Sequence, residues 1–196
     1  MRHQLGYPAP MPDDAAPIAP VRRKLKAQDL PRLFEAGVLL PDERIELIDG
    51  EMYAMGKQGR AHWSAVAAVA FWVFRNLQEG FAASSQGPLR LSETDEPEPD
   101  VFVYPAAMDV NEVRGPDVAL LIEIADTSLK KDQLLKAPMY ARHAVAPYWL
   151  VDLGARATWV RRLEAQGYTE AEPAPFARPH FAPPLSSPLV LADLRL

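Results

Sequence analysis

The feature that most constrains the fold is the segment from Val118 to Tyr140, VALLIEIADTSLKKDQLLKAPMY. It begins with five consecutive apolar residues, residues 118–122, and such a run is typical of a central strand that is covered on both faces. Glu123 follows inside the same run. A carboxylate at the end of a buried strand is costly unless a cation compensates it. The segment therefore predicts either a functional acid or a strand that simply ends at the surface.

The second half of this segment has a helical spacing. Asp132, Lys136 and Tyr140 recur every four residues, so on a helix they share one face. Either Lys136 is an ordinary solvated lysine, or this face brings it to the acid at the end of the strand. Pro138 lies within the same pattern and is expected to kink the helix or to move its start to a later residue. The rest of the chain decides between these alternatives.

The length and composition indicate one soluble domain. A chain of 196 residues is long enough for a sizeable core. We expect residues 1–20, rich in proline and alanine, to be a flexible leader, and residues 21–196 to form a single domain. The absence of cysteine excludes disulfides, thiolate zinc sites and cysteine nucleophiles, and it suits the cytoplasm. The most apolar run, residues 65–74, is shorter than the roughly 20 residues that cross a membrane, so no membrane contact is expected.

The remaining patterns alternate between strand and helix. A helix is expected over residues 28–36, followed by a hairpin over residues 44–55 that turns at Asp49-Gly50. A helix over residues 60–78 should bury a stripe that includes Trp63. Further strands are predicted at residues 81–91, 101–104, 148–152 and 158–163. The sequence thus predicts an α/β fold in which helices flank one mixed sheet, with an N-terminal helix and a β-hairpin in front.

Asp100 and Glu123 lie at the ends of strands that the pattern makes neighbours in the sheet. Two carboxylates brought together repel each other unless a cation lies between them. Mg²⁺ or Mn²⁺ suits such a pair, because hard divalent ions prefer oxygen ligands. A nearby lysine would orient a water, help to deprotonate it, or stabilise charge developing on a phosphorane. This combination predicts hydrolysis of phosphodiester bonds.

Six short motifs occur together in order, and together they resemble the restriction-endonuclease family often called Uma-two, a branch of the PD-(D/E)XK nuclease superfamily. The resemblance covers roughly residues 22–163 and implies a restriction-endonuclease-like fold. The motifs are Glu46 to Glu51, His62, Glu98 to Val101, Leu121 to Ser128, Asp132 with Lys136 and Tyr140, and Pro147 to Asp152.

The resemblance implies a metal site. Asp100 corresponds to the aspartate of the PD half-motif and Glu123 to the acid of the second half, and both are expected to be metal ligands, with the Ile124 carbonyl as a further ligand. Glu46 corresponds to an additional acid that binds a second metal or a metal-bound water. His62 corresponds to a secondary site residue.

The position of the usual catalytic lysine, two residues after Glu123, holds Ala125. The chain resembles family cases in which the catalytic lysine lies on the following helix instead, and this resemblance implies that Lys136 takes that role. If Lys136 does not reach the site, the implied activity would be weak or lost.

Two functions from different classes therefore follow. The first is a Mg²⁺- or Mn²⁺-dependent endonuclease that acts on nucleic acid, with DNA preferred. The second is a catalytically inactive module that keeps the fold for binding or assembly, which the net charge of −5 and the alanine at position 125 favour. A homodimer is a further expectation, with residues 158–163 as an edge for pairing.

Overall fold

The computed structural model describes residues 23–56, 58–169 and 172–196, so the expected leader at residues 1–20 lies outside the described residues. The elements alternate between helices and strands as the sequence predicts. In chain order they are η1 (Ala27–Asp29), α1 (Leu30–Glu35), β1 (Ile45–Ile48), β2 (Glu51–Ala54), α2 (Arg60–Arg75), β3 (Phe81–Ser85), β4 (Val101–Pro105), η2 (Val110–Glu112), η3 (Gly115–Asp117), β5 (Leu120–Ala125), α3 (Leu129–Lys131), η4 (Asp132–Lys136), α4 (Ala137–Arg142), β6 (Tyr148–Asp152), β7 (Ala157–Arg161), β8 (Leu163–Glu164), β9 (Gly167–Tyr168), β10 (Ala174–Pro175) and η5 (Leu191–Asp193).

A six-stranded mixed sheet forms the centre of the molecule, with the strand order β10-β7-β6-β5-β4-β3. Strands β5 and β6 are parallel, and the other neighbours are antiparallel. Every residue of β5 is buried. The continuous apolar run of β5 is therefore explained as the sequence predicts, because both faces of this strand are covered.

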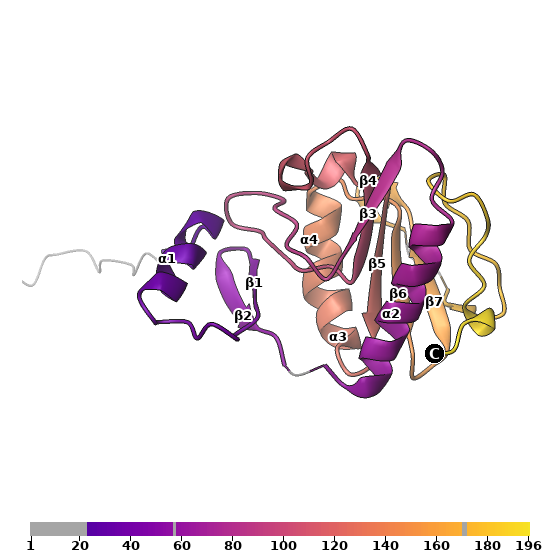
Figure 1. The fold of residues 1–196 in the computed structure, drawn as a ribbon, viewed down its shortest axis with the longest axis horizontal. Helices are drawn as coiled ribbons and strands as arrows, with labels where there is room; N and C mark the ends of the chain where they lie inside the picture. Colours follow the sequence, from indigo (N-terminus) through magenta and orange to yellow (C-terminus); the bar gives the residue numbers. More distant parts are fainter. Residues whose placement is uncertain (1–22, 57, 170–171) are drawn as a thin grey trace, which may run out of the picture.

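Helices cover both faces of the sheet (Figure 1). Helix α2 and the C-terminal segment bury one apolar core, and the layer of α3, η4 and α4 buries the other. The predicted stripe on α2 is correct for Val66, Ala70 and Val73, which are buried, but wrong for Trp63, which is 63% exposed. Ala65 and Val69 complete the buried face instead. The buried stripe is therefore made of small and branched side chains, which allow the helix to lie close to the sheet.

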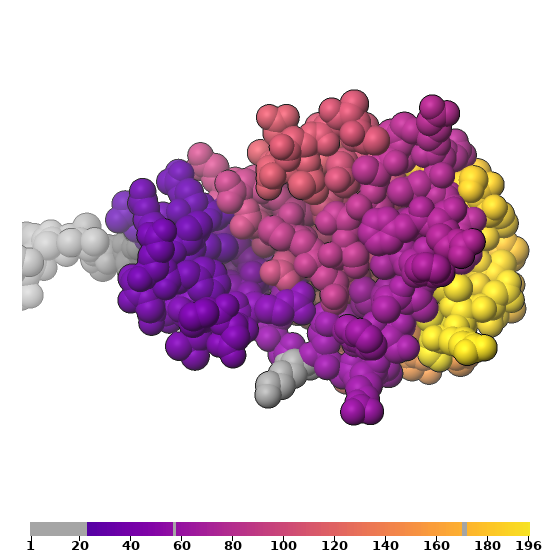
Figure 2. Space-filling view, in the orientation of Figure 1, coloured from indigo at the N-terminus to yellow at the C-terminus, as the bar shows by residue number. Residues whose placement is uncertain are grey.

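The predicted hairpin is confirmed, with β1 and β2 joined by Asp49 and Gly50. Both residues have positive φ, as a two-residue type I′ turn requires. Glu46 and Leu47 on β1 are fully buried, whereas Met52 on β2 is partly exposed. Figure 2 shows this N-terminal part of the chain as a lobe at one end of the molecule. One strand of the hairpin therefore faces the main body and carries an acid into it.

The helical segment after β5 passes Pro138 without a break. Its middle, η4, is a π-helical turn in which the N–H of Ala137 donates to the carbonyl of Asp132. Pro138 lies at the start of α4, directly after this wide turn. A π turn accommodates the missing N–H and the proline ring, which a regular helix interior would not. The expected kink is thus a local widening, and Asp132, Lys136 and Tyr140 all stay buried on one face.

Two strand predictions need correction. The strand expected over residues 81–91 ends at Ser85, because Gln86 has positive φ and the chain leaves the sheet there. The edge expected for a homodimer, residues 158–163, is covered at its start, because β10 pairs with Ala157 and Thr158 of β7. The homodimer itself stays a prediction. No helix in the described ranges is long and apolar enough to cross a membrane.

Asp95 connects three parts of the chain. Its carboxylate accepts hydrogen bonds from the N–H of Asp49 in the hairpin turn at 2.7 Å and from the Ser92 hydroxyl at 3.1 Å. Nε2 of His143, directly after α4, lies 2.9 Å from the same carboxylate. Although burial opposes it, these hydrogen bonds lower the pKa of Asp95 below its usual 3.8. The Asp95 carboxylate therefore holds the hairpin against the helical layer.

We expect Asp95→Asn to lower the free energy of unfolding by about 1–3 kcal/mol near neutral pH, because hydrogen bonds to a charged acceptor are lost. A lowered pKa in the folded state gives stability that is present above the unfolded pKa and is lost as the pH falls through the folded one. The difference between wild type and variant should therefore shrink at pH values below about 3.8.

Thermal unfolding across this pH range measures the difference. The exposed Asp193 provides a matched control, because Asp193→Asn makes the same chemical change without those contacts. A difference for Asp95→Asn that is constant with pH would show that the carboxylate charge is not what holds the hairpin.

Candidate active site

Six predicted site residues line a single cavity of about 220 Å³ at one end of the sheet: Glu46, His62, Asp100, Glu123, Ile124 and Lys136. They come from five places in the chain. Glu46 is on β1, His62 is in the first turn of α2, and Asp100 precedes β4. Glu123 and Ile124 are on β5, and Lys136 ends η4. The fold thus assembles residues that are up to 90 positions apart in the sequence, from Glu46 to Lys136.

Asp100 and Glu123 are held in the same way. Oδ2 of Asp100 accepts a hydrogen bond from the Ile124 N–H at 2.8 Å, which joins the start of β4 to the end of β5. Oε1 of Glu123 accepts one from the Tyr140 hydroxyl at 2.6 Å. Within the described ranges, the other oxygen of each carboxylate, Oδ1 of Asp100 and Oε2 of Glu123, has no hydrogen-bond partner. Each acid is therefore anchored by one oxygen and keeps one available at the cavity.

Lys136 reaches the site. Its Nζ lies 2.6 Å from Oε1 of Glu123 and 2.8 Å from Oε1 of Glu46, and the residue is only 3% exposed. Ala125 is on the same face of β5 as Glu123, because side chains alternate along a strand, and this face packs against the helical layer. A helix lysine can therefore bring its ammonium to the side of Glu123 that an in-strand lysine would occupy.

The charges around Lys136 are unequal. Burial opposes ionisation of Glu46, but the cations of Lys136 and Lys131 outweigh it and hold the pKa of Glu46 at about 2. The buried ammonium is in turn stabilised by the carboxylates, which raise the pKa of Lys136 against the effect of burial. Burial, together with repulsion from Asp100, Asp132 and Glu46, raises the pKa of Glu123 despite Lys136. Lys136 and Glu46 thus form the ionised pair, whereas the raised pKa of Glu123 favours its protonated form as long as no further cation is present.

His62 completes the wall of the cavity. Its Nε2 lies 3.4 Å from Oδ2 of Asp100, and this interaction raises the pKa of His62 although burial opposes it. Its Nδ1 is buried and has no hydrogen-bond partner among the described residues. The resemblance made His62 a secondary site residue, and the structure places it against Asp100 on the same cavity.

Two further residues, Lys131 and Asp132, contribute to this site although the sequence predicted no role for them. Lys131 donates to Oε2 of Glu46 at 2.5 Å and lies 5.8 Å from the centre of the Tyr53 ring. Asp132 lines the same cavity and is 4% exposed; burial raises its pKa. The spacing of Asp132 from Lys136 was a usable signal for it. Lys131 carried no such signal, because its contact depends on where the hairpin lies.

The donor set fits a hard divalent cation. Among the described residues, no three histidine, aspartate or glutamate side chains converge closely enough to hold a metal by themselves. Mg²⁺, however, is commonly bound through one or two carboxylates together with waters and substrate phosphate oxygens. The two available oxygens of Asp100 and Glu123 supply such a pair, and a cation there would relieve the repulsion that raises the pKa of Glu123. Both oxygens of Glu46 already accept hydrogen bonds, from the Glu98 N–H and the two lysines, so its role as a metal ligand stays a prediction.

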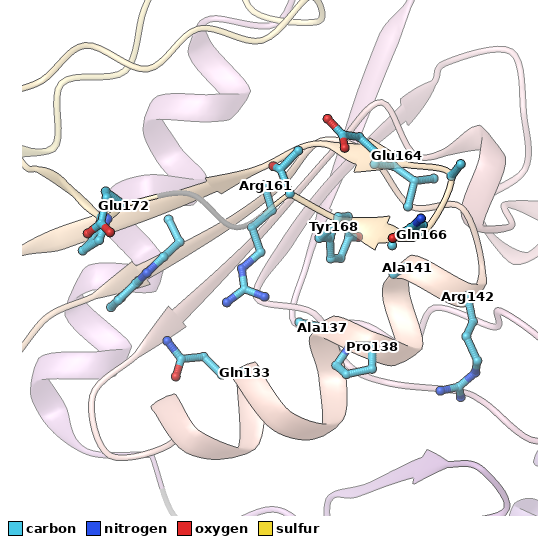
Figure 3. A pocket seen from close by; sticks show the side chains of 16 residues that line it. Gln133, Ala137, Pro138, Ala141, Arg142, Arg161, Glu164, Gln166, Tyr168 and Glu172 are labelled. Atoms are coloured by element: carbon cyan, nitrogen blue, oxygen red, sulfur yellow. The ribbon is translucent and has the colours of Figure 1, made fainter.

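A larger groove, of about 1080 Å³, lies between α4 and the β8–β9 hairpin. Figure 3 shows Arg161 from the sheet and Gln133 from the helix pointing toward one another across it. Its charged residues are of both signs, Arg142 and Arg161 with Glu164 and Glu172, and none of the predicted site residues lines it. The smaller cavity is therefore the candidate active site.

Comparison with known proteins agrees with this assignment of the fold. The Uma2 family model, described as "Putative restriction endonuclease", matches residues 28–195. No curated protein sequence matches the chain significantly. Among solved structures, the fold is similar to that of a "putative nuclease belonging to DUF820" from Anabaena variabilis, with a TM-score of 0.60 and 16% sequence identity over 82% of this chain and 95% of that one. Because the family model spans most of its length, the chain belongs to the Uma2 family of restriction-endonuclease-like proteins.

Proposed function

We propose that this protein is a Mg²⁺- or Mn²⁺-dependent endonuclease that hydrolyses phosphodiester bonds in DNA. The observation that carries the proposal is the arrangement of Asp100, Glu123 and Lys136 at one cavity. Each acid is anchored by one oxygen and offers the other, and a buried ammonium lies beside the second acid. Membership of a family described as restriction endonucleases supports a nuclease, and DNA as the substrate extends that description.

In this proposal, Asp100 and Glu123 hold the metal with the Ile124 carbonyl, and Glu46 is a candidate for a second metal or a metal-bound water. A bound divalent ion would supply positive charge to the phosphate and make a bound water more acidic. The protein keeps the ligands in place beforehand, because the Ile124 N–H fixes Asp100 and the Tyr140 hydroxyl fixes Glu123. The free energy needed to bring two carboxylates together is thus supplied when the protein folds, and not when the substrate binds.

Lys136 acts as a fixed positive charge in this scheme. A lysine whose pKa is raised stays protonated, so it cannot take a proton from water. Its ammonium can donate hydrogen bonds to oxygens that become more negative as the phosphorane forms. Of the three roles that the sequence leaves open, deprotonation of the water is therefore disfavoured, and the position of Lys136 supports orientation of the water and stabilisation of charge. Glu46 and Lys131 then act as positioning residues, since Glu46 accepts from both lysines.

The competing function is an inactive member that keeps the fold for binding or assembly. Ala125 in place of an in-strand lysine favours it, as does the net charge of −5. The position of Lys136 removes the first of these arguments, because an ammonium is present at the site from another element. Cleavage decides between the two functions.

We expect the wild-type protein to nick supercoiled plasmid at low salt with Mg²⁺ or Mn²⁺. Low salt is needed because an acidic protein that holds DNA through few phosphates loses affinity as salt rises. Asp100→Asn and Glu123→Gln should abolish nicking, and Lys136→Ala should slow it by roughly 100-fold or more, the scale for loss of one electrostatic stabiliser.

The Lys136 variant needs its own control, because its removal leaves buried Glu46 and Glu123 without their cation and can impair folding. Lys136→Arg keeps the charge but changes its geometry, and a thermal melt of each variant reports whether it folds. Nicking that survives in a folded Lys136→Ala protein would discard the role of Lys136 but keep the metal site. No cleavage of single- or double-stranded substrate by the wild type with either metal would support the inactive module.

Millimolar Mg²⁺ or Mn²⁺ should raise the melting temperature, because a metal that binds only the folded site stabilises it. At concentrations ten- to a hundredfold above Kd, the gain is roughly 1–3 kcal/mol, or a few degrees for a chain of this size. Asp100→Asn should remove the gain, and Asp193→Asn, on the surface, should keep it. A gain that persists in Asp100→Asn would place the metal elsewhere.

A further inference from the structure

The outer face of α2 carries an unusual set of exposed aromatic residues. Trp63, Phe71 and Phe74 are 63%, 63% and 47% exposed. With Ala67, which is also exposed, they recur at intervals of three and four residues, so they form one stripe along the helix, opposite the buried stripe. In Figure 2 this helix lies at the front of the molecule, between the N-terminal lobe and the C-terminal segment. Exposed aromatic side chains grouped on one face in this way make the face a candidate binding surface.

The charge on α2 is also distinctive. The helix contains no aspartate or glutamate between Arg60 and Arg75, although the whole chain has a net charge of −5. One arginine stands at each end of the stripe, and the Arg75 guanidinium lies 5.5 Å from the centre of the Phe71 ring. This face therefore combines aromatic rings with cations and carries no acid of its own.

The N-terminal end of the stripe lies close to the candidate active site. Trp63 follows His62 directly, and both Gly59 and His62 line the cavity that holds Asp100 and Glu123. Figure 1 shows that the N-terminal end of α2 lies beside α3, at the end of the sheet where the site is, and that the helix runs from there along the sheet. A ligand that lies along α2 would thus lead into the cavity.

A second copy of the chain fits this face poorly. A helix of 16 residues is about 24 Å long, so a stripe about 10 Å wide offers roughly 240 Å², well below the approximately 800 Å² per partner of a stable interface. Two-fold pairing of antiparallel α2 helices would also bring Arg60 of one copy toward Arg75 of the other, with no acid on either helix to compensate. Both the area and the charge favour a polyanion instead.

We propose that the outer face of α2 binds an unpaired stretch of nucleic acid, with bases stacked on Trp63, Phe71 and Phe74 and phosphates paired with Arg60 and Arg75. Aromatic side chains stack on bases only where these are free of their own partners, and single-strand binding proteins combine such rings with positive charge. This inference rests on the proposed function, because the bound strand would deliver a phosphate to the cavity where the nuclease reaction is proposed to occur. It makes the preferred substrate single-stranded, or duplex with an unpaired segment.

The test measures binding separately from cleavage. Asp100→Asn protein, which is expected to leave the substrate intact, is titrated at low salt with single-stranded DNA, single-stranded RNA and duplex DNA of one sequence. Tryptophan fluorescence gives the readout, because Trp63 is far more exposed than the buried Trp149. We expect quenching by a single strand at lower concentration than by duplex. Trp63→Leu and Phe71→Leu, in the same background, should each weaken binding by about 5- to 100-fold, the scale for loss of one stacked base. Binding to the Phe71→Leu protein is measured by the quenching of Trp63, and binding to the Trp63→Leu protein by the fluorescence anisotropy of a labelled strand.

Trp159→Leu is the matched control, because Trp159 packs against the core on the opposite face of the sheet, and it should leave binding unchanged. Equal affinity in all variants, or duplex bound as tightly as single strand, would overturn the proposal. So would a dimer in sedimentation that Phe71→Arg dissociates, since a second copy would then cover the stripe. Binding that follows this pattern, without cleavage by the wild type, would support the α2 binding surface and overturn the proposed nuclease activity. Cleavage of strands by protein in which Trp63→Leu and Phe71→Leu leave binding unchanged would support the nuclease activity and overturn the α2 binding surface.

Discussion

The buried ammonium of Lys136, between Glu46 and Glu123, is the interaction on which the rest of the structure depends. It joins the hairpin, the central strand and the helical layer, because each of the three residues comes from a different one of these parts. Removing one partner of a buried charge cluster leaves the others uncompensated, which is far more costly than the cluster is favourable. The hairpin forms a sheet separate from the six-stranded one, and this ion cluster holds it in place together with the contacts of Asp95 and the backbone hydrogen bonds between Leu47 and Glu96.

The fold was predictable where local patterns and tertiary packing agree. The apolar run of β5 and the Asp49-Gly50 turn need no knowledge of distant segments, since burial on both faces and a two-residue turn leave direct signatures in the sequence. The prediction failed where two faces of one helix compete. On α2, apolar residues occupy more than one stripe, so periodicity alone cannot say which side meets the sheet, and Trp63 was placed on the wrong one.

The candidate site was predictable only in part, and the reason is again distance along the chain. Asp100 and Glu123 stand at strand ends, where sheet pairing brings them together, and the resemblance to a nuclease family supplied Glu46, His62 and Lys136. Lys131 meets Glu46 across 85 residues of sequence, in a contact that no local pattern encodes. The π-helical turn before Pro138 is equally invisible to periodicity, although it lets the helical segment continue through the proline, and Lys136 lies at its end.

The residues that line the cavity help to decide whether the protein only keeps a stable fold or also carries a functional site. Six acids line it with two lysines, Lys131 and Lys136, so acids outnumber cations there. Four of the acids are buried, where burial penalises charge: Glu46, Asp100, Glu123 and Asp132. A chain that needed only a stable core would gain by replacing such groups with apolar residues of similar volume, a change that is often neutral or stabilising. Perturbed carboxylates held at the wall of a cavity are instead typical of functional sites, because the repulsion among them is relieved when a cation or a cationic group of a ligand binds. The burial and the crowding of carboxylates that raise the pKa of Glu123 are therefore better explained by a binding partner than by the demands of folding.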